Sequence, residues 1–242
     1  MRLDRFLAET GFGSRSDVKK LIKKGGVTVN GESVCRPEVH IDENCDEVFV
    51  GTVAAVYRKF IYLMLNKPGG YVSATWDKKL PTVIDLLPEE YRHFEPFPVG
   101  RLDIDTEGLL ILTNNGALAH RLLSPKSHVP KTYVARLEKP ALPADAEAFR
   151  EGVVIEGGYK TLPASLVPFS GGDGENWAEV VIAEGKFHQV KQMFEATGNK
   201  VEYLKRIKMN NLCLDSELPT GKMRELTKAE EKSLIGDLEQ EG

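Results

Sequence analysis

The densest group of chemically active side chains in this sequence lies in residues 98–110, Pro-Val-Gly-Arg-Leu-Asp-Ile-Asp-Thr-Glu-Gly-Leu-Leu. Acids, an arginine and two glycines directly precede an apolar run, 109–113, which predicts a buried strand. A loop that enters a buried strand can be held rigidly enough to carry a functional site. The chemistry of this protein is therefore expected in this loop.

The residue types in this loop are compatible with a calcium site or with a simple turn. Asp103, Asp105 and Glu107 fall on positions 1, 3 and 5 of the EF-hand pattern. Position 12, however, is Asn114 instead of the glutamate that calcium needs, and the preceding Phe-Pro pair (97–98) cannot end a long entering helix. In the other alternative, the carboxylates only cap the backbone of a turn.

The same loop reads Gly-Arg-Leu-Asp-x-Asp-Thr-x-Gly-Leu-Leu, and in this form it resembles the signature motif of the RsuA-type RNA pseudouridine synthases. The resemblance extends over essentially the whole chain. Its other motifs are Leu-Asn-Lys-Pro-Gly at 65–69, Ser-Pro-Lys-x-His-Val-x-Lys-x-Tyr at 124–133, Glu-Gly-Lys-Phe-His-Gln-Val-Lys-Gln-Met at 184–193, Leu-Lys-Arg at 204–206 and Gly-Lys-Met-Arg-Glu-Leu-Thr at 221–227. One departure lies at 209–211, Met-Asn-Asn, where relatives usually show a glycine.

The resemblance implies that the protein isomerises uridine in RNA. This reaction breaks the bond between N1 and C1′, rotates the base and rejoins it through C5. No redox change occurs and no group is added, so neither a metal nor another cofactor is expected. The nucleophile implied is Asp103, because an aspartate with a reference pKa of about 3.9 is ionised at neutral pH. The sequence leaves open whether Asp103 attacks the sugar at C1′ or the base at C6.

Two more residues receive roles from the resemblance. Tyr133 matches the active-site tyrosine, which is expected to stack on the flipped base. Arg101 matches an arginine that enters the RNA helix in place of the target nucleotide, a role that suits a planar cation. An ordinary ion pair of Arg101 with Asp105 or Glu107 is the alternative.

Lys191 matches the basic residue that pairs with the nucleophile, where many relatives carry arginine. Residues 187–191 alternate like a strand, which would place residues 187, 189 and 191 on one face. An inward-facing charge on that face needs a partner, and Asp103 would supply it. Lys186 is the competitor for this pairing, although it is better suited to a phosphate contact, and His188 would point away from the Lys191 face.

The first 50 residues resemble the small RNA-binding module of the ribosomal-protein S-four type. Apolar spacing predicts a helix at 3–7 and a second helix after Ser14, a hairpin turns at Asn30-Gly31, and a strand follows near 47–50. Residues 1–24 hold seven bases and three acids. The bases expected to bind RNA are Arg2, Arg5, Arg15, Lys19, Lys20 and Lys23.

We expect an α+β protein with two domains, an RNA-binding domain at 1–55 and a synthase domain at 60–242, joined by a connector near 51–58. The second domain would be built on a mixed, largely antiparallel sheet. Its expected strands are 60–65, 109–113, 131–137, 176–183 and 187–191, and its expected helices are 117–123, 140–151 and 227–238.

Composition and charge fit this interpretation. The 242 residues include 41% hydrophobic and 28% charged residues, as in a soluble globular protein, and no apolar run approaches the roughly 20 residues of a membrane span. The net charge of −4 hides a second basic stretch, 185–208, with six bases and two acids. Three widely spaced cysteines fit a reduced cytosol and argue against a disulfide framework or zinc site.

The expected partner is ribosomal RNA, either bare small-subunit RNA or an early assembly particle, and the expected protein is a cytoplasmic monomer that does not bind membranes. The stretch from Ser124 to Tyr133 resembles the small-subunit branch of the family more than the large-subunit branch. The alternatives are a synthase that acts on large-subunit RNA and a non-catalytic RNA-binding assembly factor. The latter would tolerate loss of Asp103, Tyr133 or Lys191, which this chain retains.

Overall fold

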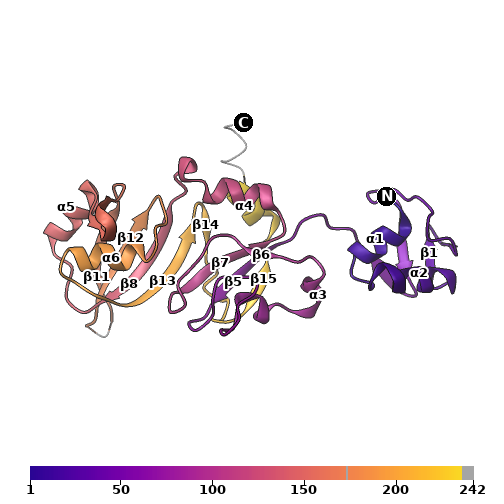
Figure 1. Ribbon diagram of the computed structural model, residues 1–242, viewed down its shortest axis with the longest axis horizontal. Helices are drawn as coiled ribbons and strands as arrows, with labels where there is room; N and C mark the ends of the chain where they lie inside the picture. The colour runs from indigo at the N-terminus through magenta and orange to yellow at the C-terminus, as the bar shows by residue number, and fades with distance from the viewer. Residues whose placement is uncertain (173, 236–242) are drawn as a thin grey trace. The chain divides into compact units, whose positions relative to one another are not determined.

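The computed structural model describes residues 1–172 and 174–235, and the chain divides into two compact units (Figure 1). The first unit consists of Met1–Ile61 with Pro88–Glu95, and the second of Tyr62–Leu87 with the chain from Pro96 onward. Both units contain helices and sheets, so the predicted α+β class is confirmed. Among the described residues, none of the helices has the length and apolar composition needed to cross a bilayer.

The first unit packs two short helices on a small antiparallel sheet of strand order β2–β1–β3–β4. Its elements are α1 (Leu3–Glu9), α2 (Arg15–Lys23), β1 (Val27–Val29), β2 (Glu32–Ser33), β3 (Val48–Val50), β4 (Val53–Ala55) and α3 (Glu89–Arg92). Leu3, Phe6 and Leu7 of α1 and Val18 and Ile22 of α2 are buried together. Their spacing of three or four residues is the amphipathic pattern that predicted both helices.

Two local signals in the first unit act as the sequence predicts. The Ser14 hydroxyl accepts a hydrogen bond from the backbone N–H of Asp17 and thereby caps α2. Asn30 and Gly31 have φ angles of 51° and 83°, which the tight turn between β1 and β2 requires. The predicted connector at 51–58 is partly wrong, because β4 occupies its centre and pairs with β3.

The second unit is built on a larger mixed sheet of strand order β11–β12–β8–β13–β7–β5–β15, with β14 paired to β13 and β6 to β7. The strands are β5 (Tyr62–Lys67), β6 (Phe97–Pro98), β7 (Glu107–Thr113), β8 (Lys131–Leu137), β11 (Ser165–Ser170), β12 (Asn176–Ile182), β13 (Val201–Met209), β14 (Leu212–Cys213) and β15 (Met223–Glu225), with β9 (Val154–Ile155) and β10 (Tyr159–Lys160) forming a separate pair. The helices are η1 (Val83–Leu86), α4 (Gly116–Leu123), η2 (Pro125–Ser127), α5 (Pro143–Glu151), η3 (Glu156–Gly158), α6 (Gln189–Ala196) and α7 (Lys228–Ile235).

The centre of this sheet positions the loop singled out in the sequence. β7 pairs antiparallel with β5 and parallel with β13, so it is buried between two neighbours. Leu109 and Ile111 of β7 pack with Leu118 and Leu122 of α4 in one apolar core. In Figure 1, α5 and α6 lie over the part of the sheet made by β11, β12, β8 and β13. The loop 99–106 therefore enters the sheet at a strand that is held by a neighbour on each side.

One predicted strand is wrong. Residues 187–191 do not form a strand, because α6 begins at Gln189 and continues to Ala196. Five alternating residues cannot distinguish the two structures, whereas the buried residues Val190, Met193 and Phe194 follow the helical spacing of three and four. The predicted C-terminal helix is present as α7, and residues 236–238 of that prediction lie outside the described residues.

Gly108 is required where β7 meets β13. Its φ angle is 98°, and a Cβ atom built on it would lie 2.2 Å from the backbone oxygen of Arg206. Gly108→Ala should therefore destabilise the protein by roughly 2–4 kcal/mol, because both the backbone conformation and the strand pairing are lost. Urea unfolding of the variant and the wild type measures this loss.

Gly116→Ala provides the control. Gly116 lies in α4, and a Cβ atom there would have no neighbour within 4 Å among the described residues. This substitution should change stability by less than about 1 kcal/mol. Equal unfolding midpoints for the two variants would contradict the close approach of β7 and β13.

Candidate active site

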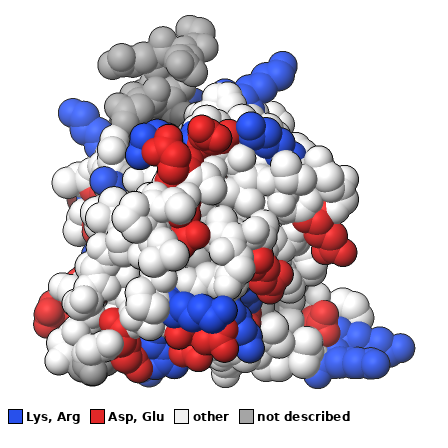
Figure 2. Space-filling model, turned by 90° about the vertical axis from the view of Figure 1, so that its left-hand side faces the viewer, with Lys and Arg blue, Asp and Glu red and all other residues white. Residues whose placement is uncertain are grey.

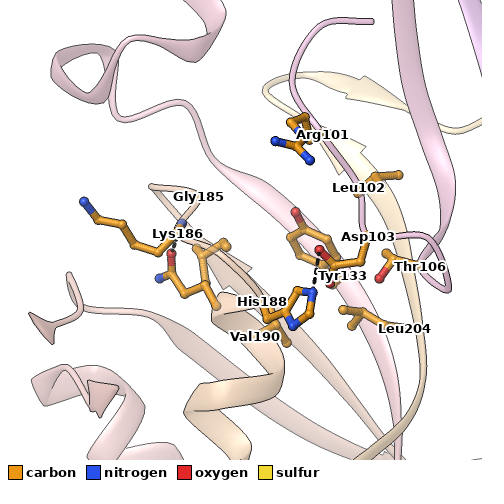
Figure 3. Close-up of a pocket in the computed structure, with 12 residues that line it drawn as sticks. Arg101, Leu102, Asp103, Thr106, Tyr133, Gly185, Lys186, His188, Val190 and Leu204 are labelled. Carbon is orange, nitrogen blue, oxygen red and sulfur yellow. Dashed lines mark hydrogen bonds and ion pairs between the residues drawn. The ribbon is translucent and has the colours of Figure 1, made fainter. Parts of the chain in front are cut away.

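The loop between β6 and β7 forms one wall of a pocket in the second unit. Arg101, Leu102, Asp103 and Thr106 line it from this loop, Tyr133 lines it from β8, and residues 185–190 close the other side. Figure 3 shows Asp103 next to Tyr133, with the His188 ring reaching the Asp103 carboxylate. Three segments that are far apart in sequence thus meet around Asp103.

The buried side chain of Lys67 fixes the loop that carries Asp103. Lys67 ends β5 and is fully buried. Its ammonium group donates hydrogen bonds to the backbone oxygens of Asp103, Ile104 and Thr106, at 3.1, 3.3 and 2.8 Å, and to that of Pro68 at 3.0 Å. A buried ammonium needs such partners, so these carbonyl groups must converge on it. The loop conformation follows from this requirement.

Burial lowers the pKa of Lys67 to about 8, although the neighbouring carboxylates of Asp105, Glu107 and Asp103 act in the opposite direction. At neutral pH the group is still protonated and donates to all of its partners. The ammonium is therefore a positive charge buried directly against the backbone of the loop that carries Asp103.

Two further contacts support the same loop. The Ser73 hydroxyl donates to the backbone oxygen of Leu102 and accepts from its N–H, both at 3.0 Å. At the start of β7, the Glu107 carboxylate accepts hydrogen bonds from the Gly69 N–H and from the Tyr203 hydroxyl, at 3.4 and 2.8 Å. Each oxygen of the Glu107 carboxylate thus accepts a hydrogen bond within the protein. With strands β6 and β7 on either side, the loop also lacks the helices of an EF-hand.

Two nitrogen-bearing side chains, Lys191 and His188, face Asp103 from the start of α6. Lys191 Nζ lies 3.2 Å from one carboxylate oxygen of Asp103, and His188 Nε2 lies 3.6 Å from the other. Lys191 Nζ also donates to Asp105 at 2.6 Å. The Lys191 side chain is 18% exposed and that of Asp103 25%, so this ion pair is half-buried. The charge of Asp103 is therefore compensated where it lies.

The helical structure of 189–196 explains why both side chains reach Asp103. Residues 188 and 191 would lie on opposite faces of a strand, but three residues place them on one side of a helix. The expectation that His188 points away from the Lys191 face is therefore wrong. His188 has a φ angle of 47° and precedes the first residue of α6, and the Gln189 side chain accepts from the Lys186 N–H at 2.9 Å. This turn holds the imidazole toward the loop.

Asp105 helps to place Lys191. Burial raises the pKa of Asp105, but the hydrogen bond and the positive charge of Lys191 outweigh this effect, so the pKa lies below its usual value. Asp105 is therefore ionised at neutral pH. Its side chain is 67% exposed, so it orients the lysine from the solvent side, while Asp103 faces the pocket.

Tyr133 and Thr106 form the floor of the pocket. Tyr133 is 8% exposed and lies in β8 between Val180 of β12 and Arg206 of β13. Thr106 is 2% exposed, and its hydroxyl has no hydrogen-bond partner among the residues that the structure describes. A buried polar atom without a partner calls for an explanation, and here it belongs to a residue that lines the pocket.

Comparisons with known proteins match this arrangement over both units. The family model described as RNA pseudouridylate synthase matches residues 61–196, and that of the S4 domain matches residues 1–46. The chain belongs to the RNA pseudouridine synthase family. It is 51% identical to a Bacillus subtilis protein described as an uncharacterized RNA pseudouridine synthase, over 95% of this chain and 96% of that protein. The predicted resemblance to RsuA-type synthases is confirmed.

Two other relatives also span both proteins almost completely. Ribosomal small subunit pseudouridine synthase A of Escherichia coli is 38% identical over 97% of this chain and 100% of that protein. A solved structure described as a pseudouridylate synthase superposes with a TM-score of 0.66 at 37% identity, covering 97% of this chain and 100% of that one. The similarity to these two proteins therefore extends over both units of the chain.

The remaining predicted site residues of the synthase lie apart from Asp103. Arg101 is exposed at the rim of the pocket and makes no ion pair with Asp105 or Glu107 among the described residues. Lys186 points away from Asp103 (Figure 3), with its ammonium group 4.3 Å from the centre of the Tyr159 ring. Lys191 and not Lys186 therefore pairs with Asp103.

The second basic stretch, 185–208, does not form one basic surface. Arg206 is 2% exposed and donates to the backbone oxygen of Leu109, and Lys191 is paired with two carboxylates. Figure 2 shows the side of the second unit that faces left in Figure 1, where acidic and basic residues are scattered among uncharged ones. The exposed bases of the first unit remain the clearest basic group.

The bases of the first unit differ in how closely an acidic side chain pairs with them. Arg2 pairs with Asp4 at 2.9 Å and Arg5 with Glu9 at 2.6 Å, whereas the longer distance from Lys20 to Asp17 is 3.6 Å. On α2, Arg15, Lys19, Lys20 and Lys23 are all exposed, and Lys24 follows at its end. Four of the bases expected to bind RNA are thus exposed on one helix.

The sequence analysis missed Lys67 and Thr106 as site residues. A signal for Lys67 was available, because it shares one face of its strand with the apolar residues Leu63 and Leu65. A lysine in this position must be buried and paired. The unpaired hydroxyl of Thr106 has no signal of this kind, since it depends on the pocket around it.

Lys67→Met tests the role of the buried ammonium. Methionine fills a similar volume but cannot donate to the four carbonyl oxygens, so the loop loses its attachment. We expect a loss of about 1–3 kcal/mol in unfolding free energy and at least about 100-fold in turnover, because Asp103 shifts. Urea unfolding and single-turnover kinetics measure the two effects, and full activity in a stable variant would contradict the role.

Lys191→Ala tests the ion pair. Because the pair is half-buried and water can enter, the loss of stability should be about 1–2 kcal/mol, below the roughly 3–5 kcal/mol of a fully buried pair. Turnover should fall more strongly than in Asp105→Asn, which leaves Lys191 next to Asp103. If the two variants lost the same activity, Lys191 would act only by ordering the loop.

Proposed function

We propose that this synthase isomerises a uridine in small-subunit ribosomal RNA and uses Asp103 as the nucleophile. The observation that carries the proposal is the Asp103 carboxylate, which lines a pocket with Tyr133 and is compensated by Lys191 and His188. A carboxylate held in this way is fixed in direction and lines a space that can accept a flipped base.

The reaction needs only groups that this pocket contains. Asp103 adds to C1′ or to C6 of the uracil, the bond between N1 and C1′ breaks, and the base rotates on Tyr133. If the ester is at C1′, C5 displaces the Asp103 carboxylate as it bonds to C1′; if the ester is at C6, C5 bonds to C1′ first and the carboxylate leaves C6 when C5 loses its proton. In both routes C5 gives up its proton and N1 takes one up. The hydroxyl of Thr106 is placed to hold a polar group of the base during the rotation.

Arg101 is proposed to occupy the space that the flipped nucleotide leaves in the RNA. Its side chain is exposed at the pocket rim and has no competing ion pair with Asp105 or Glu107 among the described residues. A planar guanidinium can stack between bases and also hold a phosphate. Lys186 is proposed to contact phosphate from the opposite rim.

The preference for small-subunit RNA is supported by relatives. The Escherichia coli relative named for the ribosomal small subunit matches this chain over its full length. The stretch from Ser124 to Tyr133, which resembles that branch, forms η2 and leads directly into β8. It thus connects a surface segment to the pocket. A synthase that acts on large-subunit RNA is the alternative.

We assign the docking of the RNA to an N-terminal domain at 1–55 and the reaction to a domain at 60–242. The protein would act as a monomer in the cytoplasm, on bare small-subunit RNA or an early assembly particle. The match of residues 1–46 to the S4 domain and the exposed bases of α2 support the docking role.

Asp103→Asn should abolish isomerisation and leave RNA affinity within a few-fold. Asparagine keeps the shape but lacks the negative charge, and loss of an essential nucleophile should reduce turnover to below about 1%. Parallel reactions of both proteins on unmodified small-subunit and large-subunit RNA measure this effect. Modification of large-subunit RNA alone would overturn the proposed substrate, and residual turnover above that level would exclude Asp103 as the nucleophile.

Replacing Lys20, Lys23 and Lys24 of the S4 domain by alanine should weaken RNA binding and reduce its salt dependence. Each phosphate contact that is lost should lower the slope of log K against log salt by about 0.7–0.9. Filter binding at several salt concentrations measures the slope. Turnover at saturating RNA should not change, and an unchanged slope would contradict the docking role of α2.

A further inference from the structure

We propose that Phe187, stacked on His188 at the edge of the pocket, is a platform on which a nucleobase next to the target uridine stacks. The inference rests on the proposed function and adds a second base-binding subsite to it. It is carried by the exposure of Phe187, its ring contact with His188, and the contact of His188 with Asp103.

Phe187 is an unusually open apolar side chain for its position. It is 74% exposed, and the residues on either side of it, Lys186 and His188, line the pocket. Its ring is stacked on the His188 ring with centroids 3.8 Å apart and planes 18° apart. One face is thus covered by imidazole, and the high exposure leaves the other face open to a planar partner.

The ring is held in place by the backbone that carries it. The Phe187 carbonyl accepts a hydrogen bond from the Gln192 side chain at 2.9 Å, and the Gln192 N–H donates to the His188 carbonyl at 3.0 Å. The N-terminal turn of α6 therefore fixes residues 187 and 188 before RNA binds. A surface that is already ordered loses little entropy when a partner stacks on it.

RNA supplies the partner that fits this surface. A base next to the target uridine presents a planar face, and an aromatic ring beside the pocket can stack on it. The stack would continue from base to Phe187 to His188, whose Nε2 lies 3.6 Å from Asp103. Binding of the neighbouring base would thus be connected to the residues that hold the nucleophile.

Stacking on an aromatic ring predicts a defined kinetic signature. The full-length Phe187→Ala protein should show a kcat/KM for unmodified small-subunit RNA that is about 5- to 100-fold lower, mostly through a higher KM. Phe187→Trp should retain wild-type values, because it preserves an aromatic face. Phe169→Ala is the matched control: Phe169 is another exposed aromatic residue, 46% exposed, in β11 and outside the pocket.

A second measurement locates the base. Once the wild-type enzyme has identified the target, RNA oligonucleotides with 2-aminopurine at each neighbouring position are bound to the Asp103→Asn protein. Fluorescence should be quenched by stacking at one neighbouring position, and adding Phe187→Ala should remove this quenching without changing the circular dichroism spectrum.

The outcomes separate this inference from the proposed function. If the wild type modifies small-subunit RNA but Phe187→Ala matches Phe169→Ala in KM, and quenching persists, the platform is refuted and the function stands. If the wild type modifies neither ribosomal RNA, the proposed function itself fails.

Discussion

The burial of one ammonium group, that of Lys67, determines the geometry of the active site. A fully buried lysine must be surrounded by acceptors, and in this protein they are the backbone oxygens of Pro68, Asp103, Ile104 and Thr106. The loop conformation is thus determined by the hydrogen bonds that the Lys67 ammonium needs at the end of β5. Lys67 can reach these backbone oxygens because β5 and β7 are neighbours in the sheet.

The same site balances its charges over a short distance. Lys67 lies beneath the loop, and Lys191 and His188 approach from α6, while Asp103 and Asp105 lie between them. Asp105 holds the lysine from the solvent side, so Asp103 remains free to face the pocket. An uncompensated carboxylate in a half-buried site would take up a proton more readily. The arrangement of Asp103 therefore depends on both the helix α6 and the loop.

Much of this architecture could be predicted from local patterns. The strand β8 has the bounds that its alternating residues predicted, and the capping by Ser14 and the turn at Asn30 are as expected. At 209–211, Asn210 adopts a φ angle of 52°, a left-handed conformation that asparagine tolerates better than most residues. Patterns of this kind are visible because they depend on neighbours in sequence.

The parts that could not be predicted depend on contacts distant in sequence. Five alternating residues at 187–191 predict a strand, but α6 begins at Gln189. The strand would direct His188 away from Lys191, whereas in the structure His188 faces Asp103. The role of Lys67 depends on carbonyl groups 36 to 39 residues away. Arg206 belongs to the second basic stretch of the sequence, but its side chain is buried in the sheet and donates to the backbone oxygen of Leu109.

We propose that Asp103, held by this loop, converts one uridine of small-subunit RNA into pseudouridine. The most direct test of this proposal is to map pseudouridine in both ribosomal RNAs from cells that lack the gene, complemented with the wild type or with Asp103→Asn. We expect one site in small-subunit RNA to be lost in the deletion, restored by the wild type and still absent with Asp103→Asn. An unchanged map in the deletion, or restoration by Asp103→Asn, would contradict the account.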